Sequence, residues 1–81
     1  MEKKQINEID LHGIRHQKAL DLISQTLYRN QLQGSFTLTI ITGNSSYLQK
    51  IIFDEILEGS QYKYYIPNWN LGQIIVEYIE L

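Results

Sequence analysis

Four short segments of the chain have the pattern of β-strands, at residues 6–12, 35–41, 62–66 and 73–79. Apolar and polar side chains alternate clearly in the first two, and such alternation predicts a strand with one face on a core. The second segment is also rich in β-branched residues, which strengthens the prediction. A loop rich in turn residues, 67–72, joins the last two segments.

Two longer segments, about 16–33 and 46–58, place apolar residues three and four positions apart, which predicts amphipathic helices. A glycine follows each segment and is expected to end the helix. Ser46 and Gln49 fit a capping box, whereas Arg15 marks the start of the first helix poorly. The predicted apolar stripes are Ala19, Leu20, Ile23, Leu27 and Leu32 in the first helix and Leu48, Ile51, Ile52 and Ile56 in the second.

The order β-α-β-α-β-β predicts an α/β fold that is a two-layer sandwich, with a four-stranded mixed sheet and two helices on one face. Residues 6–81 form one domain in this interpretation, and residues 1–5 form a polar, disordered N-terminus. The other face of the sheet stays open. Its expected occupants are Glu8, Asp10, His12, Thr37, Thr39, Lys63 and Tyr65.

The composition of the chain excludes some classes of function. The chain has 81 residues, of which 43% are hydrophobic and 20% charged, as in a single globular domain. Its formal charge is −2, so phosphate binding would depend on local donors rather than on a basic field. The absence of cysteine excludes disulfides, a zinc knuckle and a thiol nucleophile. Without a signal peptide or a membrane-spanning apolar run, we expect a cytoplasmic protein with no membrane partner.

Asp10 and His12 are the first candidate site. On one face of a strand their Cβ atoms would stand about 7 Å apart, a spacing that suits two groups engaging one ligand. An imidazole can act as general acid or base near neutral pH, and a carboxylate nearby would support its charged form. Glu8 would lie about 13 Å from His12, so no metal site is indicated. The alternative is an ordinary polar pair on the wet face of a sheet.

The turn at residues 42–46 is the second candidate site. It follows a predicted strand and opens a helix, where free N–H groups and the helix dipole favour a phosphate. If the first two strands are parallel, this turn meets the end of the first strand at one edge of the sheet. The alternative is a simple strand-to-helix connection. The candidate nucleic-acid contacts are Gly13, Thr42, Gly43, Asn44, Ser45, Ser46 and Lys50.

Aromatic residues near the C-terminus form a third group. Trp69, Tyr62, Tyr64 and Tyr65 lie close in sequence to the cation of Lys63. Exposed rings in such a place can stack on unpaired bases. The alternative is that these rings are core or hairpin anchors.

Four motifs in this order resemble the Smr (small MutS-related) domain over residues 6–81. They are Asp10-Leu11-His12-Gly13, Ala19-Leu20, Ile40-Ile41-Thr42-Gly43 and Gly72-x-Ile74-Ile75-Val76. The resemblance implies a fold similar to the C-terminal domain of bacterial translation initiation factor three. It also implies nucleic-acid binding and, as in several members, a nuclease that nicks DNA or cleaves RNA, including messages on stalled ribosomes.

Within this resemblance, Asp10 and His12 match an Asp-x-His motif tied to cleavage. Thr42-Gly43 matches the first half of a Thr/His-Gly-x-Gly motif, with Ser45 in place of the second glycine. We therefore predict an endonuclease in which His12 transfers protons, Asp10 orients either His12 or the attacking group, and the turn amides with Thr42 hold the scissile phosphate. The expected partners are RNA or DNA and the ribosome, and no cofactor is expected. The alternatives are a non-catalytic nucleic-acid- or ribosome-binding module and a protein-interaction domain.

Overall fold

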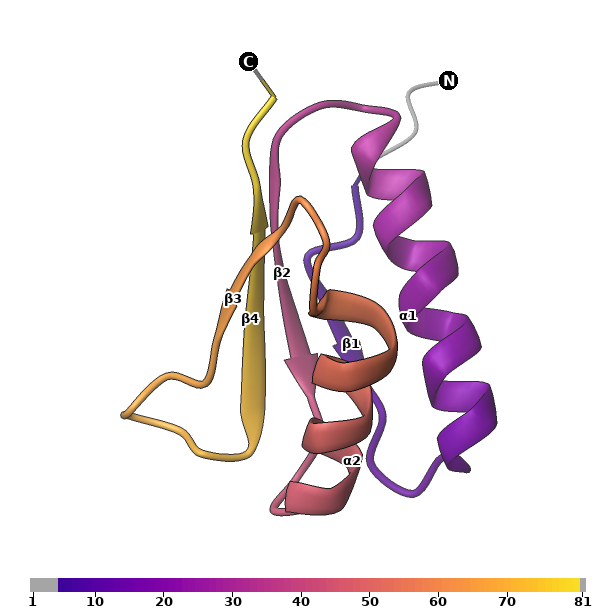
Figure 1. Ribbon diagram of the computed structural model, residues 1–81, viewed down its shortest axis with the longest axis vertical. Coiled ribbons are helices and arrows are strands. Elements are labelled where there is room, and N and C mark those ends of the chain that lie inside the picture. Colours follow the sequence, from indigo (N-terminus) through magenta and orange to yellow (C-terminus); the bar gives the residue numbers. More distant parts are fainter. Residues whose placement is uncertain (1–4, 81) are drawn as a thin grey trace.

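The computed structural model describes residues 5–80 and forms two layers (Figure 1). One layer is a sheet of four strands, and the other contains both helices and a π-helical turn. The predicted two-layer α/β fold is thus confirmed, while residues 1–4 of the predicted disordered N-terminus lie outside the described residues. The elements are β1 (Glu8–Asp10), α1 (His16–Gln31), β2 (Phe36–Ile41), α2 (Ser46–Ile52), η1 (Phe53–Leu57), β3 (Lys63–Tyr65) and β4 (Gln73–Tyr78).

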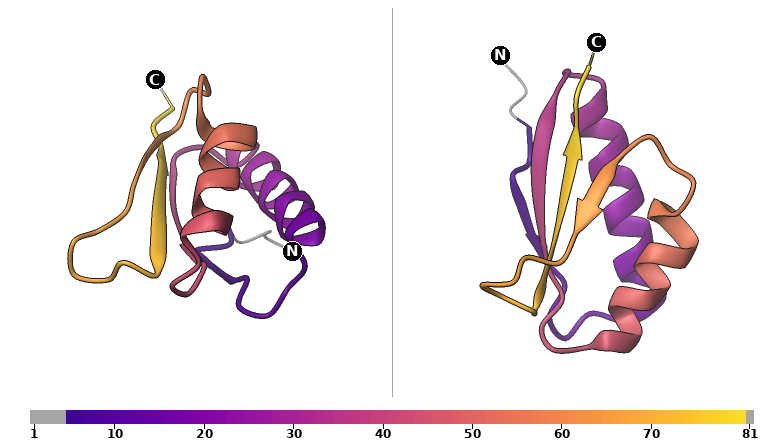
Figure 2. Two further views of the ribbon diagram at one scale, coloured as in Figure 1. Left: turned by 60° about the horizontal axis from the view of Figure 1, so that its bottom comes forward. Right: turned by 60° about the vertical axis from the view of Figure 1, so that its left-hand side comes forward.

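The sheet has the strand order β1-β2-β4-β3. β1 pairs with β2 in parallel, and β4 pairs antiparallel with both β2 and β3. The carboxyl ends of β1 and β2 therefore lie at one edge of the sheet. Both helices start at this edge, at the bottom of Figure 1, and Figure 2 shows the helical layer on one side of the sheet. The predicted convergence of the two polar turns is confirmed at the level of the backbone.

The core lies between the sheet and the helices. Alternate residues of β2 are buried, as predicted, because their side chains point into this layer. Full burial of each large aliphatic side chain contributes on the order of 1.5–3 kcal/mol. The buried apolar residues that form this core cluster are Ile9, Leu11, Ala19, Ile23, Leu27, Phe36, Leu38, Ile40, Leu48, Ile52, Leu57, Ile74 and Val76.

The end of α1 differs from the prediction. Leu32, expected in the apolar stripe, is 71% exposed, whereas Asn30 is completely buried. The Asn30 side chain accepts a hydrogen bond from the Ile6 N–H (2.8 Å) and donates one to the Ile6 carbonyl (2.7 Å). Because both polar groups of Ile6 pair with this amide, β1 begins at Glu8 and not at Ile6. The Gln5 side chain donates to the carbonyl of Asn30 at the same place (3.2 Å).

The second helix also differs from the prediction in two places. Its N-cap is Ser45, not Ser46, and the Ser45 hydroxyl accepts from the Leu48 N–H (3.2 Å). Its last part is the π-helical turn η1, closed by a hydrogen bond from the Glu58 N–H to the Phe53 carbonyl (2.7 Å). The wider turn lets Ile52 and Leu57, five positions apart, both reach the core, which regular α-helical spacing would prevent.

Candidate functional site

The chain leaves β1 through a tight turn that carries His12. The Ile14 N–H donates to the Leu11 carbonyl (3.0 Å), and Gly13, the third residue of this turn, has φ +79°. With no positive φ at His12, this geometry is a type II turn, which favours glycine at that position. His12 therefore lies just beyond the strand, not within it as predicted, and both His12 and Gly13 are exposed.

The Asp10 carboxylate contacts the backbone of this turn. Its Oδ1 atom accepts a hydrogen bond from the His12 N–H at 2.9 Å. Within residues 5–80, no hydrogen bond joins the carboxylate to the imidazole. Asp10 thus orients the main chain that carries His12 rather than the ring itself.

The imidazole of His12 lies against the second polar turn. Its Cδ2 atom is 3.6 Å from the point where a Cβ atom on Gly43 would stand. The motif after β1 and the motif after β2 therefore meet through side chain and backbone. Because the His12 ring is exposed and has no hydrogen-bond partner in the described chain, its nitrogens are free to meet a ligand.

Thr42 and Gln49 form a buried hydrogen-bond network beneath the Gly43 turn. The N–H groups of Thr42 and Gly43 donate to the Gly72 carbonyl at 2.9 and 3.1 Å. The Gln49 amide donates to the Thr42 hydroxyl (2.9 Å) and to the Leu71 carbonyl (2.8 Å). Thr42 is 4% exposed. These hydrogen bonds hold the turn in place. The Thr42 hydroxyl and the N–H groups of Thr42 and Gly43, which were predicted to bind a phosphate, therefore already have partners within the protein.

Gly72 allows the network to close. A Cβ atom on Gly72 would lie 3.3 Å from the carbonyl carbon and oxygen of Gly43. Both neighbours are backbone, which cannot move aside as a flexible side chain can. A side chain at this position would therefore need the Gly43 backbone to shift by a few tenths of an ångström.

The other predicted contacts occupy different places. Asn44 and Ser46 are exposed beside the turn, whereas Ser45 is the helix cap described above. The Lys50 ammonium pairs with the Asp54 carboxylate at 3.0 Å, one helical turn further along. Such an exposed pair contributes little free energy, about 0–1 kcal/mol, so Lys50 can exchange this partner for a phosphate.

The start of α1 adds positive charge to the same edge. Arg15, His16 and Lys18 lie here, and the first turn contains no acidic residue, although the helix dipole favours acids at this position. The His16 ring packs on the exposed ring of Tyr47 at the start of α2, with centroids 5.2 Å apart. Sequence reasoning missed this pair because only the fold brings the two helix starts together.

The aromatic group divides into two kinds. Tyr62 and Tyr64 are anchors, which agrees with the alternative given for them: Tyr62 packs on Phe36 of β2, and Tyr64 packs on Phe53 of η1. Burial raises the pKa of the Tyr62 phenol above its ordinary value. Tyr65 is partly exposed and Trp69 is 73% exposed, so these two rings are available for stacking.

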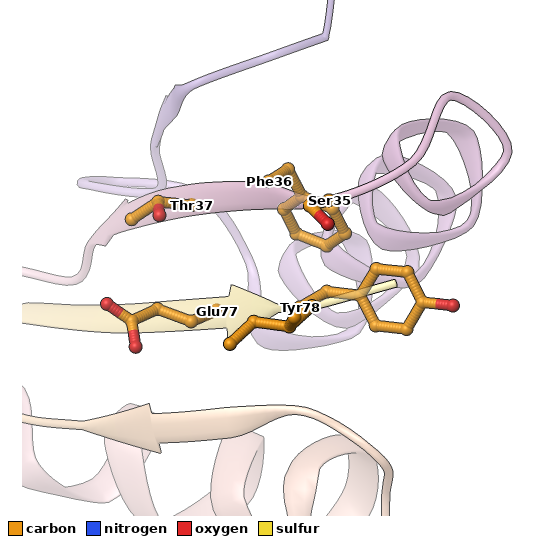
Figure 3. Close-up of a pocket in the computed structure, with 6 residues that line it drawn as sticks. Ser35, Phe36, Thr37, Glu77 and Tyr78 are labelled. Atoms are coloured by element: carbon orange, nitrogen blue, oxygen red, sulfur yellow. The ribbon is translucent and has the colours of Figure 1, made fainter. Parts of the chain in front are cut away.

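A hollow of about 390 Å³ lies at the opposite end of the sheet from His12, where β2 begins and β4 ends. Figure 3 shows Thr37 of β2 beside Glu77 of β4, and these two residues are paired across the strands. The hollow holds a carboxylate and no cation among its lining residues, so it does not suit a phosphate.

Within residues 5–80, no group of three or more His, Asp or Glu side chains gathers closely enough to hold a metal ion. None of the helices in this part of the chain combines the length and the hydropathy that a bilayer crossing requires.

Comparison with known proteins gives one match. The family model of the Smr domain matches residues 9–68, about three quarters of the chain. The matched region includes both polar turns and ends within the loop between β3 and β4. No match was found among curated proteins or among solved structures.

Proposed function

The chain belongs to the Smr domain family, and from this premise we propose that it binds RNA or DNA at the carboxyl edge of β1 and β2 and cleaves the phosphodiester backbone there. The observation that carries the proposal is the position of His12. Its free imidazole lies on the Gly43 turn, 3.6 Å from the Cβ point of that glycine. A strand that crosses this turn would bring its phosphate within reach of the ring nitrogens.

In the proposed reaction, a ring nitrogen of His12 takes the proton from the attacking oxygen, which belongs to water or to a ribose 2′-hydroxyl. That oxygen bonds to phosphorus, the bond from phosphorus to the leaving oxygen breaks, and solvent protonates the leaving oxygen. Imidazole suits this step because it exchanges protons near neutral pH.

Asp10 is a positioning residue in this proposal, because it reaches the reaction only through the His12 backbone. Asparagine retains a side-chain oxygen that can accept the same N–H, whereas alanine does not. We therefore expect Asp10→Asn to keep most of the cleavage rate and Asp10→Ala to lose it. Equal loss in both variants would indicate instead that the negative charge of Asp10 acts directly in the reaction.

Binding is assigned to the groups around the imidazole. The cations at the start of α1 attract the phosphate backbone even though the whole chain is slightly acidic. Asn44 and Ser46 offer exposed polar side chains on the other side of the turn. The ring of Tyr47, held against His16, offers a surface on which a base can stack.

The test compares the two histidines. End-labelled RNA, end-labelled single-stranded DNA and supercoiled plasmid are incubated with the protein, with and without divalent ions, at saturating protein concentration. His12→Ala should lower the cleavage rate about 100-fold or more with little change in Kd. His16→Ala should raise Kd and leave the saturated rate unchanged. If His12→Ala cleaves as fast as the parent protein, the catalytic assignment is wrong.

A non-catalytic binding module is the second candidate, and one observation favours it. The Thr42 and Gly43 amides donate to Gly72, so they do not stabilise the charge of a reacting phosphate. This candidate predicts binding without cleavage of any of the three substrates. It also predicts that His12→Ala leaves every measured signal unchanged except a modest change in Kd.

A further inference from the structure

A second hollow adjoins the Gly43 turn. Its volume is about 370 Å³, and it lies between the start of α2 and the loop that joins β3 to β4. It is lined by Asn44, Ser46, Gln49, Ile66 and Leu71. Two of these residues, Asn44 and Ser46, also flank the turn on which His12 lies, so the hollow lies next to the proposed phosphate site.

Gln49 gives the hollow a hydrogen-bond acceptor. Its Nε2 atom must face the Leu71 carbonyl and the Thr42 hydroxyl, because it donates to both. The Oε1 atom therefore points elsewhere and accepts no hydrogen bond within residues 5–80. Since no buried side-chain oxygen in that range lacks a partner, Oε1 reaches solvent, and Gln49 is one of the residues that line the hollow.

The walls of the hollow are apolar and fixed. Leu71 is 68% exposed, and Ile66 is the other apolar residue that lines the hollow. The loop between them is braced by hydrogen bonds from the Asn70 N–H to the Pro67 carbonyl (3.2 Å) and from the Gly72 N–H to the Asn70 side chain (2.9 Å). An exposed leucine on a rigid loop is already ordered for contact with a flat apolar ligand.

We propose that this hollow binds one unpaired nucleobase of the strand whose phosphate lies at His12. An unpaired base offers apolar faces for Ile66 and Leu71 and N–H donors for the Gln49 oxygen, and its sugar-phosphate would extend toward Asn44 and Ser46. In a duplex the faces of that base are stacked and its edge is paired, so it cannot enter. The proposal rests on the proposed function and adds to it a preference for single-stranded over duplex nucleic acid.

The test uses fluorescence anisotropy with a short single-stranded RNA of mixed sequence, the same RNA as a duplex, and the full chain. The parent protein should bind the single strand about 10-fold more tightly than the duplex. Leu71→Asp should weaken single-strand binding about 10-fold and leave duplex binding unchanged. The matched control is Leu32→Asp, because Leu32 is 71% exposed and lies at the far end of α1. This control adds the same charge and should change neither affinity.

Abasic RNAs sharpen the test, in a series where one base is removed at a time. One position should account for the preference of the parent protein, and the Leu71→Asp variant should be insensitive at that position. The Asn44 and Gln49 side-chain amide signals in ¹H–¹⁵N spectra should shift with the intact RNA and shift less with that abasic RNA. Equal affinity for single strand and duplex, or no effect of Leu71→Asp, would overturn the base site while leaving the proposed function standing. No binding to any RNA or DNA would overturn the proposed function itself.

Discussion

Each end of the sheet contains a buried side-chain amide, but the two amides have different surroundings. At each end a buried side-chain amide pairs with the backbone of a distant segment: Asn30 with Ile6 at one end, and Gln49 with Leu71 at the other. Around Asn30, the amide uses both its oxygen and its nitrogen on the protein. Around Gln49, the nitrogen is used and the oxygen is left over, and His12 lies exposed nearby. The difference is that the Asn30 end only holds two segments together, while the Gln49 end also leaves a hydrogen-bond acceptor and an imidazole exposed.

The largest expected effect is at the end that only holds. Asn30→Ala removes two buried hydrogen bonds and leaves both polar groups of Ile6 without a partner. We expect the free energy of unfolding to fall by about 2–4 kcal/mol in urea titrations followed by circular dichroism. RNA affinity measured under folding conditions should stay the same. Asn68→Ala, at an exposed asparagine, is the control and should change stability by less than about 0.5 kcal/mol.

Thr42→Val tests the opposite end with a smaller change. The variant keeps the shape of the side chain but removes the hydroxyl that accepts from Gln49, which should cost about 1–2 kcal/mol. Because this hydroxyl also holds the Gly43 turn, RNA binding should weaken together with stability. Thr37→Val, on the exposed face of β2, should change neither quantity. A Thr42→Val protein with lower stability but full RNA affinity would contradict the view that this network supports the site.

Two glycines form a matched pair across the molecule. Gly13 has φ +79° and Gly59 has φ +76°, and an added Cβ would meet no atom within 4 Å at either position. Replacement by alanine should therefore cost each protein about 1 kcal/mol from backbone strain alone. Only Gly13→Ala should also slow cleavage, because only that turn carries His12. If the two variants cleave at the same rate, the geometry of the turn that carries His12 does not affect the reaction.

The smallest expected effect is a change in stability at alkaline pH, which arises from Tyr62 at the Asn30 end of the sheet. The Tyr62 hydroxyl donates to the Gln31 side chain at 2.5 Å, and burial raises its pKa. The folded state thus keeps the proton more tightly than the unfolded state does. The resulting stability is fully present below the ordinary tyrosine value near pH 10 and is lost as the pH rises through the folded pKa. Urea titrations from neutral to alkaline pH should show a smaller decline for Tyr62→Phe than for the parent protein.

Much of the fold follows from patterns that are local in the sequence. The alternation along 36–41 placed Phe36, Leu38 and Ile40 in the core, and parallel pairing of the first two strands brought their polar ends together. These features need only periodicity and chain connectivity. The Smr motifs agree with this arrangement, and the family match supports the same assignment.

The remaining features depend on contacts between distant segments. Leu32 fits the helical stripe by spacing, yet Asn30 takes the buried place because Ile6 lies there to pair with it. Thr42 looks like a phosphate ligand in the sequence, but the arrival of Gly72 turns it inward. The sequence does contain one signal for the position of His12. The order Asp10-Leu11-His12-Gly13 suits a turn in which the Asp10 side chain accepts a backbone N–H, followed by a type II turn with Gly13 at its third position.

The place of β4 between β2 and β3 has a consequence for biosynthesis. β3 touches the rest of the sheet only through β4, which is translated after it. Until β4 has emerged from the ribosome, β3 has no strand to pair with. The proposed nucleobase site is therefore expected to form only after β4 has inserted between β2 and β3.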